Sequence, residues 1–223
     1  IFRECGITKV AALRVNDRHG RFGIAEFRDA ARRLGHPLRV EVRWKRGDRD
    51  FSAQLRRIAE SDAEAIVLWG NASDAAAAVR AIRQWNETNP TAPLPKRVFG
   101  CDRLASQTFL AEAGAAAEGV VAVATYDPTR DDPRLTTFAN AFTTRFGHEP
   151  EAYAAHGYDG ANILLAAIRK AGLNRVRIRN ALYEYKHFDG VTGPIEFDST
   201  LNDVGPVYLT TVQNGKFAYR EAK

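Results

Sequence analysis

Short apolar runs alternate with segments of helical spacing along the first half of the chain. The runs that read as strands occupy residues 9–15, 38–44, 63–70, 96–100 and 118–126. Between them, apolar residues recur every three or four positions, which is typical of helices that pack one face on a sheet. Strands that alternate with helices predict an α/β fold with a doubly wound parallel sheet.

Polar residues and glycines mark the ends of the predicted helices. Gly35 ends the first helix, which follows the strand over 9–15. Asp50 is predicted to cap the start of the second helix and Ser73 that of the third, because their side-chain oxygens can accept a hydrogen bond from a free backbone N–H. A fourth, short helix is expected over 104–113.

The pattern changes after residue 127. Three helical stretches follow, and the first carries an apolar stripe at Leu135, Phe138, Phe142 and Phe146. One lone strand is expected over 192–198, and a hairpin over 207–220 turns at Asn214–Gly215. Wide apolar stripes need a covering surface. These helices are therefore expected either to pack on the first sheet or to belong to a sheet whose other strands lie outside this sequence.

Composition excludes several classes of protein. The chain has 223 residues, of which 45% are hydrophobic and 26% charged, as in an ordinary globular protein of one or two domains. Its apolar runs fall short of the ~20 residues that span a bilayer. The net charge of +5 comes from arginines scattered over separate helices, so no nucleic-acid partner is expected. The chain opens on Ile1 and has no Met, which suggests a mature protein or a fragment.

The common catalytic and metal motifs are absent. The sequence has no GxSxG, P-loop, GxGxxG or HExxH pattern, and its five histidines show no metal-ligand spacing. Cys5 and Cys101 are interpreted as two free thiols, with a disulfide between them left open. We therefore predict no catalytic residue, no metal and no cofactor, so that the protein is not an enzyme.

Polar residues with ligand-binding chemistry follow three of the predicted strands. They are His19, the segment from Trp69 to Asn71, and Cys101–Asp102. In a parallel sheet these loops share one edge, where ligands bind. Asp102 could pair with a ligand ammonium through charge-assisted hydrogen bonds. Other readings stay open: Asp102 could cap the next helix, Asn71 could bond its own backbone, Trp69 could belong to the core, and His19 could only fill the turn before the helix.

The order of motifs resembles a known family. The segments that carry the resemblance are "VAALRVNDRHGRFGIAEFRDAARRLG", "GDRDFSAQLRRI", "AEAIVLWG", "EGVVAVATYDP", "FANAFTTRFGHEPEAYAAHGYDGANILLAAIRKAG" and "GVTGPIEFD". Together they cover nearly the whole chain. They are similar to type I periplasmic binding proteins, and most of all to the leucine/isoleucine/valine-binding branch that serves branched-chain amino acid ABC transporters.

The resemblance implies two α/β lobes joined by three crossings, with a ligand held between them. Residues 1–124 and 206–223 would form the second lobe, and 127–203 the late helices and strand of an incomplete first lobe. The opening third of such a protein has no counterpart here, so about 120 further residues are expected before Ile1. Tyr126 lies at the second implied crossing, where it would line the ligand cleft or serve the hinge.

The resemblance also implies a function. Asp102 matches the acidic residue that receives an amino acid's ammonium, whereas His19 and Asn71 stand where the family often has aromatic residues, which favours a more polar ligand. The expected protein is a periplasmic or extracellular solute-binding protein that captures an amino acid or similar small polar solute by hinge closure. Its partner would be an ABC transporter permease, its only link to the membrane. Two alternatives are a ligand-sensing domain of a receptor or kinase, and an α/β enzyme without a recognisable motif.

Overall fold

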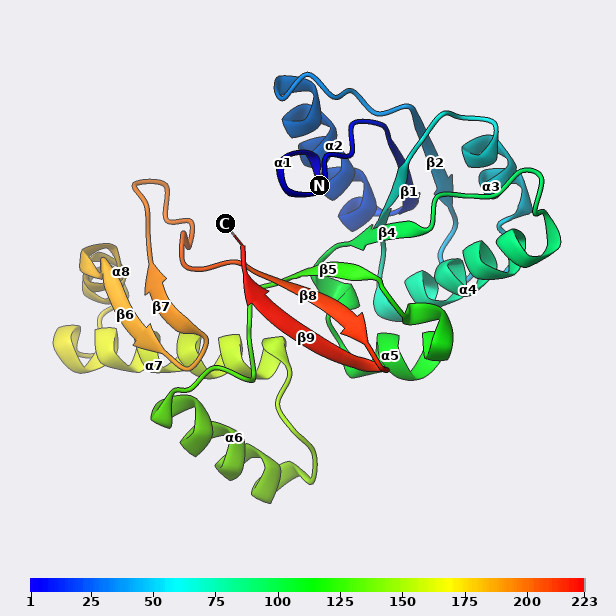
Figure 1. Ribbon diagram of the computed structural model, residues 1–223. Coiled ribbons are helices and arrows are strands. Elements are labelled where there is room, and N and C mark those ends of the chain that lie inside the picture. Colours follow the sequence, from blue (N-terminus) through cyan, green and yellow to red (C-terminus); the bar gives the residue numbers. More distant parts are fainter. Residues whose placement is uncertain (223) are drawn as a thin grey trace. The chain divides into compact units, whose positions relative to one another are not determined.

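The computed structural model describes residues 1–222, which form two compact units (Figure 1). Unit 1 comprises Ile1–Val123 and Leu209–Ala218, and unit 2 comprises Ala124–Tyr208 and the residues from Tyr219 onward. The chain therefore passes between the two units three times, after residues 123, 208 and 218.

The sheet of unit 1 has seven strands in the order β2-β1-β3-β4-β5-β8-β9. The pairs β1–β2, β1–β3, β3–β4 and β4–β5 are parallel, which confirms the predicted α/β class. The β8–β9 hairpin turns at Asn214 and Gly215, both with positive φ, as predicted for its two-residue loop. The strands are β1 (Val10–Val15), β2 (Val40–Trp44), β3 (Ala65–Trp69), β4 (Arg97–Gly100), β5 (Val121–Ala124), β8 (Tyr208–Gln213) and β9 (Lys216–Glu221).

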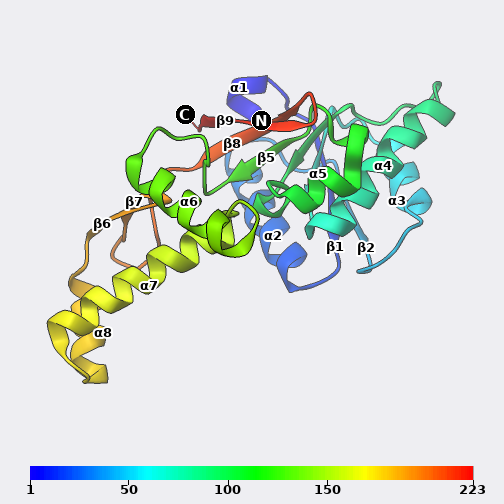
Figure 2. The same cartoon turned by 90° about the horizontal axis from the view of Figure 1, so that it is seen from below.

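Helices cover both faces of this sheet (Figures 1 and 2). Alternate residues of β1 show the two faces: Leu13 packs in a core with α3, α4 and α5, whereas Ala12 packs in a second core with α1 and α2. All six residues of β1 are buried, on both faces of the sheet, which explains why the strand is a nearly continuous apolar run. The helices are α1 (Phe2–Cys5), α2 (Arg18–Arg33), α3 (Ser52–Ala59), α4 (Ala72–Thr88) and α5 (Gln107–Ala113), with two 3₁₀ turns, η1 (Asp102–Leu104) and η2 (Gly114–Ala117).

Two predicted helix caps are wrong by one or two residues. The residue before α3 is Phe51, and Asp50 instead accepts a hydrogen bond from the Ser52 backbone N–H at 2.9 Å. Helix α4 begins at Ala72, because β3 ends at Trp69 and the chain turns at once, so its cap is Asn71. Ser73 lies inside the first turn and donates its hydroxyl to Glu112 at 2.7 Å.

The segment predicted as a helix over 104–113 is a 3₁₀ turn followed by the shorter helix α5. Ser106 caps α5, since its hydroxyl oxygen accepts a hydrogen bond from the Phe109 N–H at 3.2 Å. The reading in which Asp102 caps this helix is therefore wrong. Asp102 instead begins η1 and its side chain is exposed.

Unit 2 is built from three helices and a small antiparallel sheet. Its elements are α6 (Pro133–Phe146), α7 (Ala152–Ala171), α8 (Arg175–Glu184), β6 (His187–Gly190) and β7 (Gly193–Glu196). The strand predicted over 192–198 is present as β7, but it is not alone: it pairs with β6 from His187 opposite Glu196 to Gly190 opposite Gly193. A small core of Tyr126, Leu135, Phe138, Ala155 and Val191 holds α6 and α7 to this hairpin.

Unit 2 also leaves much apolar surface uncovered. Large apolar side chains that are about half exposed include Leu164 and Leu165 on α7 and Val176 and Tyr183 on α8. A hollow beside α6 is lined by rings, among them Phe142, Phe146, Tyr158 and Phe188. Among residues 1–222, no helix combines the length and the hydropathy that crossing a membrane requires.

Candidate functional site

The strand order places a topological switch point between β1 and β3. Helix α2 leaves the end of β1 toward one face of the sheet, and α4 leaves the end of β3 toward the other. The two following loops diverge at this switch point, and open α/β sheets bind ligands there. His19 follows β1, the segment from Trp69 to Asn71 follows β3, and Cys101–Asp102 follows β4, the next strand.

His19 is fixed by the tight entry into α2. Asp17 caps this helix by accepting a hydrogen bond from the Gly20 N–H at 2.8 Å, which places His19 in the first turn. Gly20 packs directly on the backbone carbonyl of Val15, where a Cβ atom has no room. Burial, with the nearby Arg103, lowers the pKa of His19 below its usual value despite the opposing carboxylates of Asp102 and Asp17. The imidazole is therefore neutral at pH 7.

Trp69 is the last residue of β3, beside the switch point. Its indole ring lies 6.0 Å from the His19 ring between centroids and packs against both hydrophobic cores of unit 1. Gly23 of α2 lies so close that a Cβ atom there would overlap the indole. The core reading of Trp69 is thus confirmed, and its contact with a ligand stays a prediction. Its buried Nε1–H has no hydrogen-bond partner within the described part of the chain.

The Asn71 side chain is engaged on both of its polar atoms. Its Oδ1 accepts a hydrogen bond from the Asp74 backbone N–H at 3.0 Å, and its Nδ2 donates to the Asp74 carboxylate at 2.9 Å. Asp74 is itself buried and accepts a further hydrogen bond from the Gly47 N–H at 3.2 Å. Asn71 therefore caps α4 and holds the Asp74 carboxylate, and its contact with a ligand stays a prediction.

Cys101 and Asp102 differ sharply in exposure. Cys101 is 1% exposed, and its thiol donates to the Gly70 carbonyl oxygen at 3.3 Å. Burial, opposed in part by backbone hydrogen bonds, raises the pKa of the Cys101 thiol to about 11, so the thiol is uncharged at neutral pH. Asp102 is exposed, and among residues 1–222 its carboxylate has neither a hydrogen bond nor an ion pair. Cys5 and Cys101 are both free thiols and form no disulfide with each other.

The structure brings together three side chains at this edge. The Sγ atom of Cys101 lies 3.7 Å from Nε2 of His19, and one donor atom from each of His19, Cys101 and Asp102 lies within 4.8 Å of the others. Sequence reasoning placed these residues on one edge but missed the contact between thiol and imidazole. The sequence offered one indication of this contact, namely that Cys101 and His19 each follow a predicted buried strand of the parallel sheet.

Tyr126 belongs to unit 2. It is 5% exposed and packs in the small core with Leu135 and Phe138. Burial raises the pKa of its phenol to about 12, although Arg130 works against that shift. Its position is that of a core residue of unit 2, and its part in ligand binding stays a prediction.

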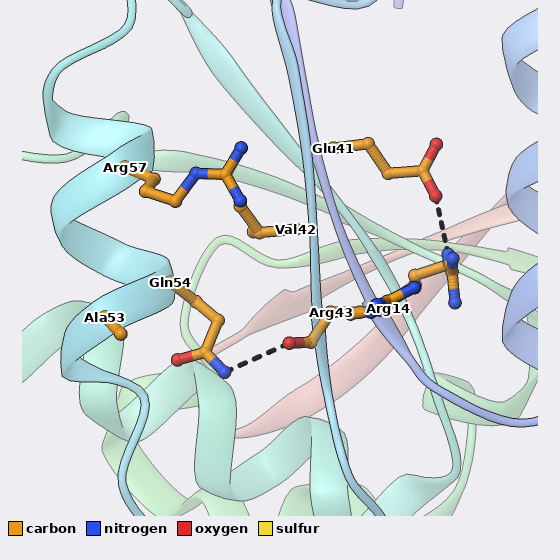
Figure 3. A pocket seen from close by; sticks show the side chains of 7 residues that line it. All are labelled: Arg14, Glu41, Val42, Arg43, Ala53, Gln54 and Arg57. Atoms are coloured by element: carbon orange, nitrogen blue, oxygen red, sulfur yellow. Dashed lines mark hydrogen bonds and ion pairs between the residues drawn. The ribbon is translucent and has the colours of Figure 1, made fainter.

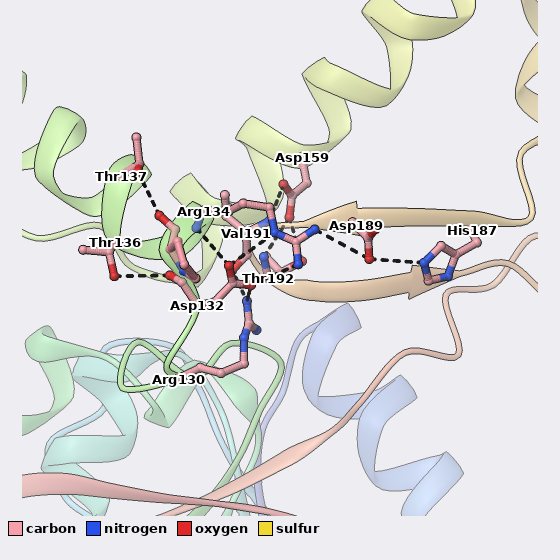
Figure 4. Close-up of polar contacts among 11 residues, drawn as sticks. Arg130, Asp132, Arg134, Thr136, Thr137, Asp159, His187, Asp189, Val191 and Thr192 are labelled. Carbon is pink, nitrogen blue, oxygen red and sulfur yellow. Dashed lines mark hydrogen bonds and ion pairs between the residues drawn. The ribbon is translucent and has the colours of Figure 1, made fainter.

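A buried polar cluster in unit 2 holds the β6–β7 turn to α7 (Figure 4). The Asp159 carboxylate accepts hydrogen bonds from the backbone N–H groups of Val191 and Thr192, both at 2.9 Å, and from the Thr192 hydroxyl at 2.7 Å. Sequence reasoning assigned Asp159 no role. The three bonds satisfy a buried carboxylate and lock the turn, so the cluster is structural.

A second polar cluster, which is partly exposed, lies at the start of α6 in the same unit. Asp132 accepts hydrogen bonds from the Arg130 guanidinium at 3.1 Å and from the backbone and side chain of Arg134. These bonds, with that of the Arg134 side chain foremost, lower the pKa of the Asp132 carboxyl to about 2. Asp132 is also the N-cap of α6.

One further hollow of unit 1 lies between β2 and α3 (Figure 3). The nearly buried Arg14 donates to Glu41 at 2.7 Å, and Glu41 also accepts from Arg28 at 3.1 Å. Gln54 of α3 donates to the Arg43 carbonyl oxygen at 3.0 Å. These bonds connect β2 to β1, α2 and α3. The polar side chains that line the hollow are therefore engaged in structural contacts, and we assign the hollow no binding role.

The comparisons with known proteins agree with this architecture. Residues 1–216 match the family described as periplasmic binding protein. The Leu/Ile/Val-binding protein homolog 2 of Brucella abortus is 30% identical over 154 residues, which are 69% of this chain and 39% of that protein. The leucine-binding protein LivK of Thermotoga maritima has a TM-score of 0.86 at 25% identity, covering 98% of this chain and 61% of its own.

A third similar protein was solved with a ligand. LivJ of Streptococcus pneumoniae, a branched-chain amino acid transporter substrate-binding protein in complex with isoleucine, has a TM-score of 0.82 at 26% identity. The match covers 99% of this chain and 62% of LivJ. The chain thus spans about three fifths of these solved structures and about two fifths of the Brucella protein. The resemblance found in the sequence is confirmed, and the chain belongs to the periplasmic binding protein family.

Proposed function

We propose that this chain is the larger part of a periplasmic or extracellular solute-binding protein that delivers an amino acid or similar small polar solute to an ABC importer. Membership of the periplasmic binding protein family supports this role, as does the likeness to LivJ, whose structure holds isoleucine. The protein binds without catalysis. Its partner is the membrane permease, which recognises the closed, ligand-bound form.

The observation that carries the proposal is the free carboxylate of Asp102 at the sheet edge. It is exposed, lacks a hydrogen bond or ion pair among residues 1–222, and follows β4, the strand next to the switch point between β1 and β3. A ligand ammonium bound there gains a charge-assisted hydrogen bond. The neutral imidazole of His19 offers a further polar contact, and Trp69 offers an apolar wall. A polar contact at His19 favours a solute more polar than leucine.

We propose that residues 1–124 and 206–223 form one lobe of the binding protein and that 127–203 form the late portion of the other. The uncovered apolar side chains of α7 and α8 support this assignment, because they need a sheet to pack on. The chain spans about 61% of the length of LivK, and the remaining part would supply that sheet. Closure of the two lobes on the solute is then a hinge motion. Tyr126 would line the closed cleft or stabilise the hinge.

The test is calorimetric titration of the full-length natural protein with a panel of amino acids and small polar solutes. At least one member is expected to bind, and Asp102→Asn is expected to weaken that binding about ten- to hundredfold, as for a lost hydrogen bond to a charged group. Glu87→Gln, which removes an exposed carboxylate on α4, is the matched control and should leave affinity unchanged. Absence of binding by every member contradicts the function, and an unchanged Asp102→Asn affinity contradicts the site.

A further inference from the structure

We propose that His19, Cys101 and Asp102 form a binding site for one transition-metal cation of intermediate softness, such as Zn²⁺. The three side chains come from two loops, and their donor atoms all lie within 4.8 Å of one another. The sequence showed no metal-ligand spacing because His19 and Cys101 are 82 positions apart. Only the sheet, which aligns the ends of β1 and β4, brings them into contact.

The distance between the first two ligands already fits a metal. In a tetrahedral zinc site, Zn–S is about 2.3 Å and Zn–N about 2.0–2.1 Å, which separates the two ligand atoms by about 3.6 Å. The Cys101 Sγ and His19 Nε2 atoms are 3.7 Å apart. A cation can therefore bind between the thiolate and the imidazole with little movement of either residue. Both are held rigidly, Cys101 by burial and His19 by the capped first turn of α2.

The third ligand can adjust to complete the site. Asp102 follows Cys101 directly, is exposed, and has no competing partner among residues 1–222. Its carboxylate can rotate toward the cation at small cost, because it breaks no other contact. Three protein ligands leave one coordination position for water, a common arrangement in zinc sites with an open position.

The donor set selects a class of cation. A thiolate and an imidazole favour Zn²⁺, Co²⁺, Ni²⁺ or copper over Mg²⁺ and Ca²⁺, which prefer oxygen ligands. On binding, the Cys101 thiol loses its proton to solvent, and the Gly70 carbonyl loses the hydrogen bond that it accepts in the metal-free protein. A divalent cation then balances one thiolate and one carboxylate beside a neutral imidazole. Arg103 is the nearby positive charge that works against the cation.

This inference does not rest on the proposed function, since metal binding is measured with the metal alone. The two occupants compete, because a bound cation neutralises the Asp102 carboxylate and repels the positive charge of a solute ammonium. Saturating metal is therefore expected to weaken solute binding. A failure of metal binding leaves the solute titration, and with it the proposed function, unaffected.

The test uses tag-free, metal-stripped full-length protein titrated with Zn²⁺ by calorimetry and with Co²⁺ by absorption. We expect one equivalent to bind, and a near-ultraviolet charge-transfer band that reports a thiolate ligand on Co²⁺. Cys101→Ser should abolish this band and weaken Zn²⁺ binding by at least about tenfold, and His19→Gln should weaken it similarly. Cys5→Ser, which removes the other free thiol, is the matched control and should change neither.

Three results would overturn the proposal: equal Zn²⁺ affinity in the wild type and in a folded Cys101→Ser protein, a Co²⁺ complex without the thiolate band, or Ca²⁺ binding as strong as that of Zn²⁺. Circular dichroism checks that each variant is folded. If Cys101→Ser does not fold, the Co²⁺ spectrum of the wild type and the Zn²⁺ affinity of His19→Gln decide the question.

Discussion

The side-chain amide of Asn71 and the carboxylate of Asp74 bond each other across the first turn of α4. Asn71 accepts from the Asp74 N–H at 3.0 Å and donates to the Asp74 carboxylate at 2.9 Å. This reciprocal pair closes the loop after β3 and buries a carboxylate that also accepts from Gly47. The loop that borders the candidate site is therefore held rigid by its own side chains.

Replacing Asn71 tests this structural role. Asn71→Ala removes the cap and one donor to a buried carboxylate, and we expect the free energy of unfolding to fall by about 1–2 kcal/mol. Asn71→Ser keeps an acceptor for the Asp74 N–H, so it should recover part of that loss. Urea denaturation of both variants gives the comparison. Equal stability of the alanine variant and the wild type contradicts the cap.

Asp159 is expected to be the most sensitive carboxylate of unit 2. Asp159→Ala leaves the Val191 and Thr192 N–H groups and the Thr192 hydroxyl without their acceptor, and we expect a loss of at least about 3 kcal/mol in the free energy of unfolding. Gly190→Ala should also destabilise, because its Cβ atom would overlap the Asp159 carboxylate. Thermal and urea unfolding measure both. An alanine variant within about 0.5 kcal/mol of the wild type would refute this role.

The ion pairs of Asp132 predict a pH dependence of stability. The pKa of its carboxyl is about 2 in the folded protein, below the usual value of about 3.9 in an unfolded chain. Its stabilisation is therefore complete above about pH 4 and disappears as pH falls through about 2. Asp132→Asn keeps the helix cap but loses the charge, so it should be less stable than the wild type at pH 7.

The difference between wild type and Asp132→Asn should shrink steadily between pH 4 and pH 2, as followed by urea denaturation at each pH. Asp132→Ala, which also loses the cap, should be less stable than Asp132→Asn by a further ~1 kcal/mol at every pH. A difference between wild type and Asp132→Asn that stays constant down to pH 2 would show that the charge plays no part.

The two free thiols are expected to react at very different rates. Burial raises the pKa of Cys101 to about 11, so at pH 8 its thiol is protonated and too deeply buried for a molecule as large as iodoacetamide, whereas Cys5 is partly exposed. Iodoacetamide at pH 8 should alkylate Cys5 first, and both thiols only in urea. Peptide mass spectrometry identifies the modified site. Equal modification of the two cysteines in the folded protein would contradict the burial of Cys101.

The same thiol links stability to alkaline pH. Because the folded pKa of Cys101 is raised, its stabilisation is complete below the unfolded value of about 8.5 and is lost as pH rises through about 11. The free energy of unfolding should therefore fall across this window, and less steeply in Cys101→Ala than in the wild type. Urea denaturation at pH 8 and pH 10.5 provides the comparison. Identical slopes would exclude Cys101 as the source.

Strands β1 and β3 were predictable because burial on both faces leaves an apolar run, and β2 because its apolar and polar residues alternate. The β6 strand was not, since the sequence His187–Gly190 contains a histidine and an aspartate and has little apolar pattern. Its turn is also held by a hydrogen bond to Asp159, 32 positions from Val191, which no local pattern reveals. The cap of α4 was predicted wrongly because several residues before this helix have side chains that can cap it. The position at which β3 ends decides which of them does.

The candidate site was only partly predictable. The rule that parallel strands end at one edge placed the three loops that carry His19, Asn71 and Asp102 at the same edge of the sheet. It could not show that the Asn71 amide bonds Asp74, because this depends on the turn angle after Trp69. Nor could it show the contact between Cys101 and His19, which needs the side-chain directions as well as the order of the strands.

Strand β8 has a consequence for synthesis on the ribosome. It lies beside β5 in the sheet, where Val212 exchanges backbone hydrogen bonds with Gly119 and Val120. Until residues 208–213 emerge, β5 is an unprotected edge that could pair with another nascent chain. Unit 1 therefore completes its sheet only after all of Ala124–Tyr208 has been translated. For the same reason, no single cut in the gene isolates either unit intact.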